Sequence, residues 1–155
     1  MTRLFAVLIS FILTMPAAAE MAQRDGWAVY PTDKAYAQLV DDAKAAAKAN
    51  GLGIVTQAGP TGAAKNRGIT IPGNRVIGVF NNKLAVQVLG LSTAAMIEAP
   101  LRLYVTENTD GSATLAYKVP SVVFAPYADE GGAELADVAS GLDQTFEKIA
   151  TAAVK

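Results

Sequence analysis

The stretch that decides the fold is LRLYVTENTDGSATLAYKV, residues 101–119, which has the pattern of a β-hairpin. Apolar and polar residues alternate along its first half, and this alternation predicts a strand with one apolar face. The segment 108–111, Asn-Thr-Asp-Gly, has the composition of a hairpin loop, and a second strand is expected from Ser112 to Val119. A hairpin set between helical segments favours an α+β fold over a doubly wound parallel sheet.

Working outward from the hairpin, two long segments have the spacing of amphipathic helices. Apolar residues recur every three or four positions between Tyr36 and Ala47, and again between Leu135 and Ala153. The second helix is expected to begin at Ala133, after a flexible break at residues 129–132. Residues 121–127 are apolar but contain a proline, so we expect a loop or an irregular edge there.

Three further strands are expected at residues 27–30, 52–57 and 75–80, where β-branched and aromatic residues gather between turn residues. Residues 83–90 have the spacing of a short helix, with Asn81 or Asn82 as its N-cap. We therefore expect an α+β fold in which an antiparallel sheet packs with two main helices. The expected order is strand, helix, strand, strand, short helix, strand, strand, helix.

The first nineteen residues have the features of a secretory signal peptide. Arg3 precedes the apolar run Leu4–Met15, and Ala17–Ala19 forms a small-residue cleavage site. An uncleaved membrane anchor is the alternative, but the run is shorter than the ~20 residues that span a bilayer. We expect cleavage after Ala19, a periplasmic or secreted location, and a single domain over residues 20–155.

The composition excludes several classes of active site. The 155 residues include no His and no Cys, so there is no imidazole base, no thiolate nucleophile, no disulfide and no zinc–thiolate site. The 13 basic and 14 acidic residues form no basic patch, and we expect no nucleic-acid partner. We assign no catalytic residue, no metal site and no cofactor.

Five segments between Val29 and Val154 occur in an order and spacing that resemble a known domain family. They are Gly51–Thr56, Ala64–Gly68, Arg75–Leu84, Ala99–Val105, and Tyr117 with Pro120. The family is DUF302, a domain family without an assigned function, and the resemblance implies a compact α+β domain that is often dimeric. The sequence departs from the family pattern at Asn82, which stands where the family commonly has proline in an Asn-Pro-Lys turn.

Two places stand out as candidate sites. At the turn Asn81-Asn82-Lys83, a helix N-terminus offers backbone N–H groups and Lys83 adds positive charge, which suits a carboxylate or phosphate. An ordinary Asn cap beside a solvated lysine is the alternative. Glu98 lies in an apolar stretch, where an acid is unexpected, and it is either an acid–base group or a solvent-facing residue at the start of a strand.

Aromatic residues supply a candidate apolar wall for a ligand. Tyr117, Phe124 and Tyr127, together with Tyr104, combine apolar rings with polar tips, although packing within the sheet explains them equally well. We expect the site where the third strand ends, with Lys83 facing Tyr117 and residues 122–127. The predicted ligand-binding set is Asn81, Asn82, Lys83, Glu98, Tyr117, Phe124 and Tyr127.

Two functions follow from these observations. The first is an exported, non-enzymatic domain that binds a small, partly apolar or anionic ligand or a partner, and that forms a homodimer. The second is an enzyme that uses Glu98, Lys83 and Tyr117 as acid–base groups on a small substrate. Convergence of these three residues on one cavity would favour the enzyme, and a purely apolar cavity would favour binding.

Overall fold

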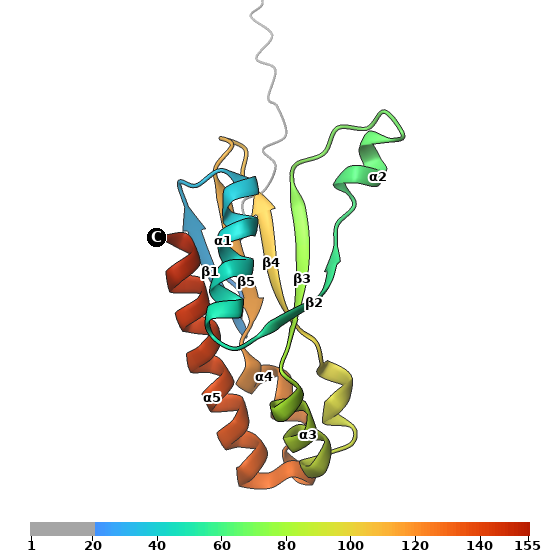
Figure 1. Ribbon diagram of the computed structural model, residues 1–155, viewed down its shortest axis with the longest axis vertical. Helices are drawn as coiled ribbons and strands as arrows, with labels where there is room; N and C mark the ends of the chain where they lie inside the picture. The colour runs from blue at the N-terminus through green and yellow to red at the C-terminus, as the bar shows by residue number, and fades with distance from the viewer. Residues whose placement is uncertain (1–20) are drawn as a thin grey trace, which may run out of the picture.

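A five-stranded antiparallel sheet forms the centre of the molecule, in a computed structural model that describes residues 21–155 (Figure 1). The strands lie in the order β1-β5-β4-β3-β2, and each neighbouring pair is antiparallel. Their bounds are β1 Trp27–Thr32, β2 Gly53–Ala58, β3 Asn74–Phe80, β4 Leu101–Glu107 and β5 Ala113–Lys118. The predicted hairpin is the pair β4 and β5. The predicted signal peptide lies outside the described residues.

Two long helices, α1 (Tyr36–Ala49) and α5 (Ala128–Val154), pack side by side against one face of this sheet (Figure 1). Three short α-helices and two 3-10 helices complete the described part of the chain, and the predicted α+β fold with its order of elements is confirmed. The short elements are α2 Thr61–Lys65, α3 Asn82–Leu91, η1 Ala95–Glu98, α4 Pro120–Phe124 and η2 Ala125–Tyr127.

The hydrophobic core lies between these two helices and the sheet. Large side chains such as Leu39, Leu103 and Phe146 are almost fully buried there. Burying each such side chain contributes roughly 1.5–3 kcal/mol of hydrophobic free energy. Ala43 and Ala150 are also fully buried, and their small side chains let helices approach one another closely.

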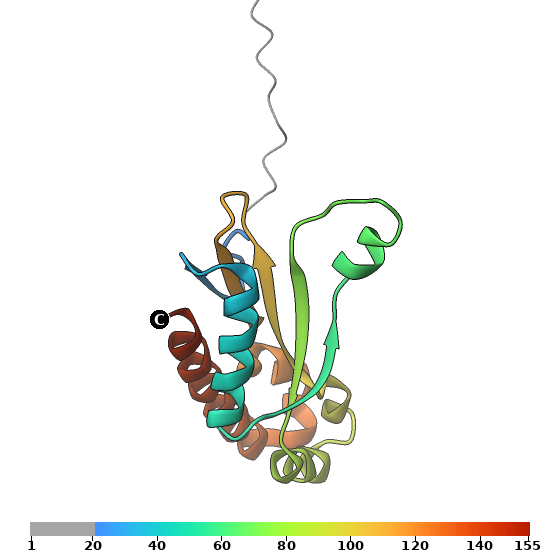
Figure 2. The ribbon, with the colours of Figure 1, turned by 45° about the horizontal axis from the view of Figure 1, so that its top comes forward.

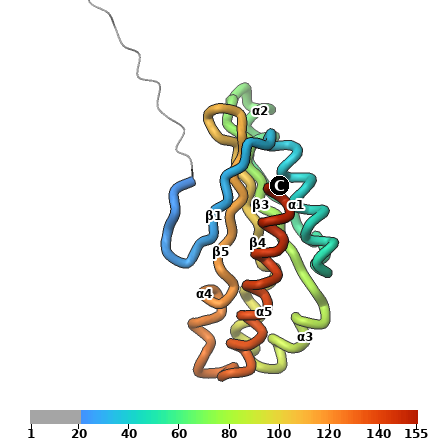
Figure 3. Tube along the Cα trace, turned by 90° about the vertical axis from the view of Figure 1, so that its left-hand side faces the viewer, coloured from blue at the N-terminus to red at the C-terminus, as the bar shows by residue number. Residues whose placement is uncertain are grey.

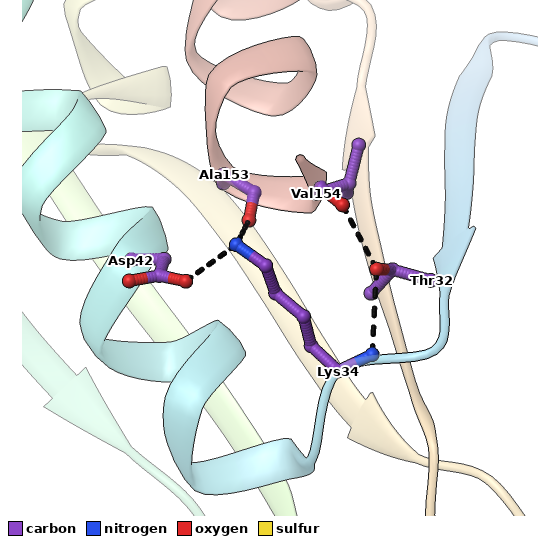
Figure 4. Close-up of polar contacts among 5 residues, drawn as sticks. All are labelled: Thr32, Lys34, Asp42, Ala153 and Val154. Atoms are coloured by element: carbon purple, nitrogen blue, oxygen red, sulfur yellow. Dashed lines mark hydrogen bonds and ion pairs between the residues drawn. The ribbon is translucent and has the colours of Figure 1, made fainter.

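The C-terminal end of α5 is tied to the link between β1 and α1 (Figure 4). The ammonium of Lys34 donates to the carbonyl of Ala153 over 2.8 Å and pairs with Asp42 over 2.6 Å. The hydroxyl of Thr32 donates to the carbonyl of Val154 over 2.9 Å. These contacts satisfy carbonyls that a helix C-terminus leaves without partners, and they place a cation at the negative end of its dipole. We call this group the Lys34 clamp.

Two segments differ from the sequence-based expectations. Residues 121–127 were expected as a loop but lie in α4 and η2, because Pro120 fits the first turn of a helix and the carboxylate of Asp143 accepts from the Ser121 N–H over 2.8 Å. The expected break at residues 129–132 is a kink inside α5. It is confined to Gly132, whose φ of 55° favours glycine.

Within residues 21–155, no helix covers the opposite face of the sheet across its centre, and we call this face the open face. Figure 3 shows α1 on one side of the strands and the residues that precede β1 on the other. The connection from β2 to β3, which carries α2, extends away from the body of the domain (Figure 2), and α2 buries none of its residues. On this face Arg102 and Lys118 are exposed, whereas Thr114 and Ala116 are buried.

Candidate functional site

The structure distributes the seven residues predicted from the sequence over three places. The first place is the start of α3, where Asn81 is the N-cap. Its side-chain oxygen accepts from the backbone N–H groups of Lys83 and Leu84 over 2.9 and 3.1 Å, and its amide donates to the Gly51 carbonyl over 2.9 Å. The cap thus already satisfies two of the donors that an anion would use at this helix end. Asn82 and Lys83 are exposed.

Asn81 and Phe124 come together at an apolar crevice beside α3, which we call the α3 crevice. Its volume is about 40 Å³, whereas ligand pockets usually hold roughly 300–1,000 Å³. A space of this size accommodates a methyl group or a short alkyl end, but not a whole metabolite. The lining is almost entirely apolar and includes Leu52, Val79, Leu84, Val88, Met96, Leu101, Leu142 and Phe146.

Glu98 and Tyr127 form the second place. The Tyr127 hydroxyl donates a hydrogen bond of 2.8 Å to a Glu98 carboxylate oxygen and so joins η1 to η2. This hydrogen bond favours the protonated phenol and raises the pKa of Tyr127 above its usual value. The pair holds two short helical turns together, and Glu98 already has a partner for its carboxylate.

Tyr117 occupies the third place, in the core beneath α5. Its ring stacks on Tyr30 with centroids 6.0 Å apart and meets the edge of Phe146 at 5.2 Å. Burial raises the pKa of the Tyr117 hydroxyl, and the nearby Tyr30 hydroxyl, 3.5 Å away, adds to the effect. Only 4% of Tyr117 is exposed. Lys83, by contrast, is exposed at the start of α3, so the two side chains do not line a common cavity.

A larger cavity lies on the open face of the sheet, and we call it the open-face cavity. Its volume of about 340 Å³ falls within the range of small-molecule sites. The lining combines aromatic and aliphatic walls with an amide and two cations, and no acidic side chain belongs to it. The lining residues are Trp27, Asn74, Val76, Leu101, Arg102, Tyr104, Tyr117, Lys118 and Val123.

The register of the sheet explains why these side chains meet. Lys118 pairs with Trp27 of β1, and the register that pairs Leu103 with Tyr117 puts Arg102 opposite Lys118 one position further along. Because side chains alternate between faces, all three point away from α1 and α5. The next row on the same face runs Val76, Tyr104, Ala116, Val29. Ala116 lies between larger neighbours in this row and is fully buried.

The open-face cavity carries positive charge without a balancing carboxylate. Within residues 21–155 the ion pairs are Lys34 with Asp42 and Lys44 with Asp41. Arg102 and Lys118 are both exposed and belong to neither pair. The Lys118 ammonium lies 6.0 Å from the centroid of the Trp27 ring and the Arg24 guanidinium lies 5.3 Å from it. Such cation–π contacts contribute only about 0.5–1 kcal/mol at exposed sites.

Trp27, Arg102 and Lys118 are cavity residues that were not predicted from the sequence. The signal for Arg102 and Lys118 was the polar half of the alternating pattern in the two hairpin strands, which predicts solvent exposure in a sheet covered on one side only. Nothing in that pattern distinguishes a solvated face from a binding face. The distinction comes from the pairing of β1 with β5, because it brings Trp27 beside the two cations.

Metal and membrane features were also sought in the described part of the chain. Residues 21–155 contain no group of three or more Asp or Glu side chains arranged to hold a metal ion. In the same residues, no helix has both the length and the apolar character needed to cross a bilayer.

Comparisons with known proteins confirm the resemblance drawn from the sequence. Residues 28–153 match a family described as "Domain of unknown function DUF302". No curated protein matches this chain. A crystal structure of an uncharacterized conserved DUF302 protein from Bacillus stearothermophilus is similar in fold, with a TM-score of 0.74 at 14% identity, and the match covers 85% of this chain and 100% of that one. The chain belongs to the DUF302 family.

Proposed function

We propose that this protein is a non-enzymatic domain that binds a small, partly apolar ligand in the open-face cavity. The observation that carries the proposal is the cavity itself, which has about 340 Å³ of space and combines aromatic and aliphatic walls with an amide and two cations. The α3 crevice, at about 40 Å³, is too small for the same role.

The positions of the acid–base candidates support binding over catalysis. General acid–base catalysis requires side chains within hydrogen-bond reach of one substrate. Glu98 is bonded to Tyr127, the Tyr117 hydroxyl lies beside Tyr30 in the core, and Lys83 is exposed on α3. An enzyme that uses Glu98, Lys83 and Tyr117 together would need these three elements to rearrange. Binding at the open face needs no rearrangement.

The experiment uses Trp27, the one tryptophan of the chain, as an internal probe. A library of metabolites is screened by thermal shift, and each hit is titrated while the indole N–H signal of Trp27 is followed by NMR. We expect hits to move this signal and to be recovered chemically unchanged. Hits that leave Trp27 unaffected would place binding elsewhere, and turnover of a hit would support the enzyme.

The site predicted from the sequence is tested in the same titration. If the ligand bound at the start of α3, Lys83→Ala would weaken binding by roughly 1–3 kcal/mol, as expected for a lost hydrogen bond to a charged group. We expect Lys83→Ala to change affinity no more than Lys48→Ala, a substitution at an exposed residue of α1. A loss of affinity in Lys83→Ala but not in Lys48→Ala would support the site predicted at the start of α3.

The location and the assembly of the protein are further parts of the proposal. The signal-peptide pattern of residues 1–19 supports export to the periplasm or beyond, and intact mass of the protein from its native host should begin at or near Glu20. Retention of Met1 in the main species would contradict cleavage.

A homodimer is supported by exposed apolar side chains at one end of the molecule. Val86 and Leu89 of α3 and Ile97 of η1 are 72%, 49% and 79% exposed. Monomeric proteins seldom leave extended apolar patches in water. Light scattering at micromolar concentration should give twice the monomer mass, and replacing Val86 and Ile97 by Ser should give the monomer. A monomer before any substitution would overturn this part.

A further inference from the structure

We infer that the ligand of the open-face cavity is an organic carboxylate with a flat, apolar or aromatic body. The inference rests on the proposed function, because it identifies the class of ligand for the same cavity. In this arrangement the carboxylate lies between Arg102 and Lys118, and the body lies against Trp27 and Tyr104.

Two like charges lie near each other at one end of the hairpin strands. The paired register of β4 and β5 ends at Leu103 and Tyr117, and Arg102 and Lys118 are the next residues of the two strands and line the same cavity. Like charges that face each other across a sheet are destabilising. No carboxylate of residues 21–155 lies within ion-pair distance of either cation to offset this repulsion. A bound anion would supply the missing charge, and its binding is favoured by the repulsion that it relieves.

The walls of the cavity favour a ligand with a flat, apolar body. The indole of Trp27 lies beside the Lys118 ammonium, and Tyr104 and Val76 form the next row of the same face. A flat apolar body gains from contact with the rings and the aliphatic side chain. Inorganic phosphate would use the cations but leave these walls in water, so the lining favours an anion that carries an apolar body.

The lining of the cavity also disfavours cationic ligands. No acidic side chain lines the cavity, and the polar groups besides the two cations include the amide of Asn74, which donates to the Tyr104 hydroxyl. An amine or another cationic ligand would meet Arg102 and Lys118 without a compensating partner. The cavity therefore distinguishes ligands by the sign of their charge.

The test compares 2-naphthoate with 2-naphthamide, which have the same ring system and shape but of which only the first is charged, by isothermal titration calorimetry on the protein without residues 1–19. We expect 2-naphthoate to bind at least tenfold more tightly than 2-naphthamide and to move the Trp27 indole signal. Inorganic phosphate should bind more weakly than 2-naphthoate. The double substitution Arg102→Gln with Lys118→Gln should abolish the preference for naphthoate over the amide.

The matched control is Lys44→Gln with Lys48→Gln, which removes two positive charges from α1 on the covered side. It should retain the preference for naphthoate. Raising the salt concentration on the unsubstituted protein gives a second readout that needs no variant to fold. Binding of naphthoate should weaken as salt rises, and binding of the amide should not.

The outcomes separate this inference from the proposed function. Equal affinity for the two probes, with the Trp27 signal moved by both, would overturn the anion preference and leave the cavity as a binding site. Tighter binding of phosphate than of naphthoate would contradict the claim that the ligand carries an apolar body. Failure of both naphthyl probes to bind would overturn the inference as a whole, and the metabolite screen would then decide the proposed function on its own.

Discussion

The two faces of the sheet differ in how far their side chains are buried. On the face covered by α1 and α5, Leu103, Leu115 and Ile77 are fully buried and pack into the core. On the open face, Arg102 and Lys118 are exposed, and the aromatic rings border a cavity. Adjacent residues of one strand thus lie in different environments. Core packing restricts which side chains fit on the covered face, and the open face holds the cavity that we propose as the binding site.

The largest expected difference between the two faces is in stability, and it is tested by truncating one large side chain on each face. Phe146→Ala should cost about 3–5 kcal/mol of unfolding free energy, because it leaves a cavity beneath Tyr117 and the sheet. Trp27→Ala should cost about 1 kcal/mol or less, because Trp27 lies on the open face and is only partly buried. Urea unfolding followed by circular dichroism measures both. Similar losses from the two substitutions would show that the open face also carries the stability of the fold.

On the covered face, the buried Tyr117 hydroxyl should make the stability of the fold depend on alkaline pH. Because burial raises the pKa of Tyr117, the folded protein keeps that proton above pH 10, where the unfolded chain loses it. The unfolding free energy should therefore be unaffected by this group below pH 10 and fall by up to about 1.4 kcal/mol per pH unit above it. Tyr117→Phe should remove this part of the fall. Parallel stability curves for the two proteins would contradict burial as the cause.

Asn81 either caps α3 or contacts the ligand, and a substitution distinguishes the two roles. Asn81→Ala should lower the unfolding free energy by about 1 kcal/mol, since it removes the cap of α3. Asn82→Ala is the matched control and should have a smaller effect, because Asn82 is exposed and lies inside the helix. Affinity for 2-naphthoate should stay the same in both variants. A loss of that affinity would move the site from the open face toward α3.

The smallest expected effect concerns the unpaired charges. Replacing Arg102 by Gln should change the unfolding free energy by about 0.5 kcal/mol or less, and the sign should be stabilising at low salt, because repulsion from Lys118 is lost. The gain should shrink in high salt. Thermal unfolding at two salt concentrations measures it. A clear destabilisation would mean that Arg102 has a structural partner.

The sequence was sufficient to predict those elements that depend on local patterns of residues. The alternation from Leu101 to Thr106 and the Asn-Thr-Asp-Gly loop predicted β4, β5 and their antiparallel pairing, and Asn81 was predicted as a possible cap. It was not sufficient where distant segments meet. The strand order places β1 beside β5, and no local pattern indicates that Trp27 pairs with Lys118. The predicted site joined Lys83 and Tyr117 by their chemistry, whereas Tyr117 is buried under α5 and Lys83 is exposed at the start of α3.

The Lys34 clamp gives the chain a mechanical property. Lys34 and Thr32 attach the last carbonyls of α5 to the end of β1, so force applied at the C-terminus first loads these hydrogen bonds and the ion pair with Asp42. Once they give way, α5 can peel off the sheet turn by turn, and the covered core follows it. A machine that unfolds proteins by pulling from this end would therefore meet its first resistance at a few polar contacts rather than in the core.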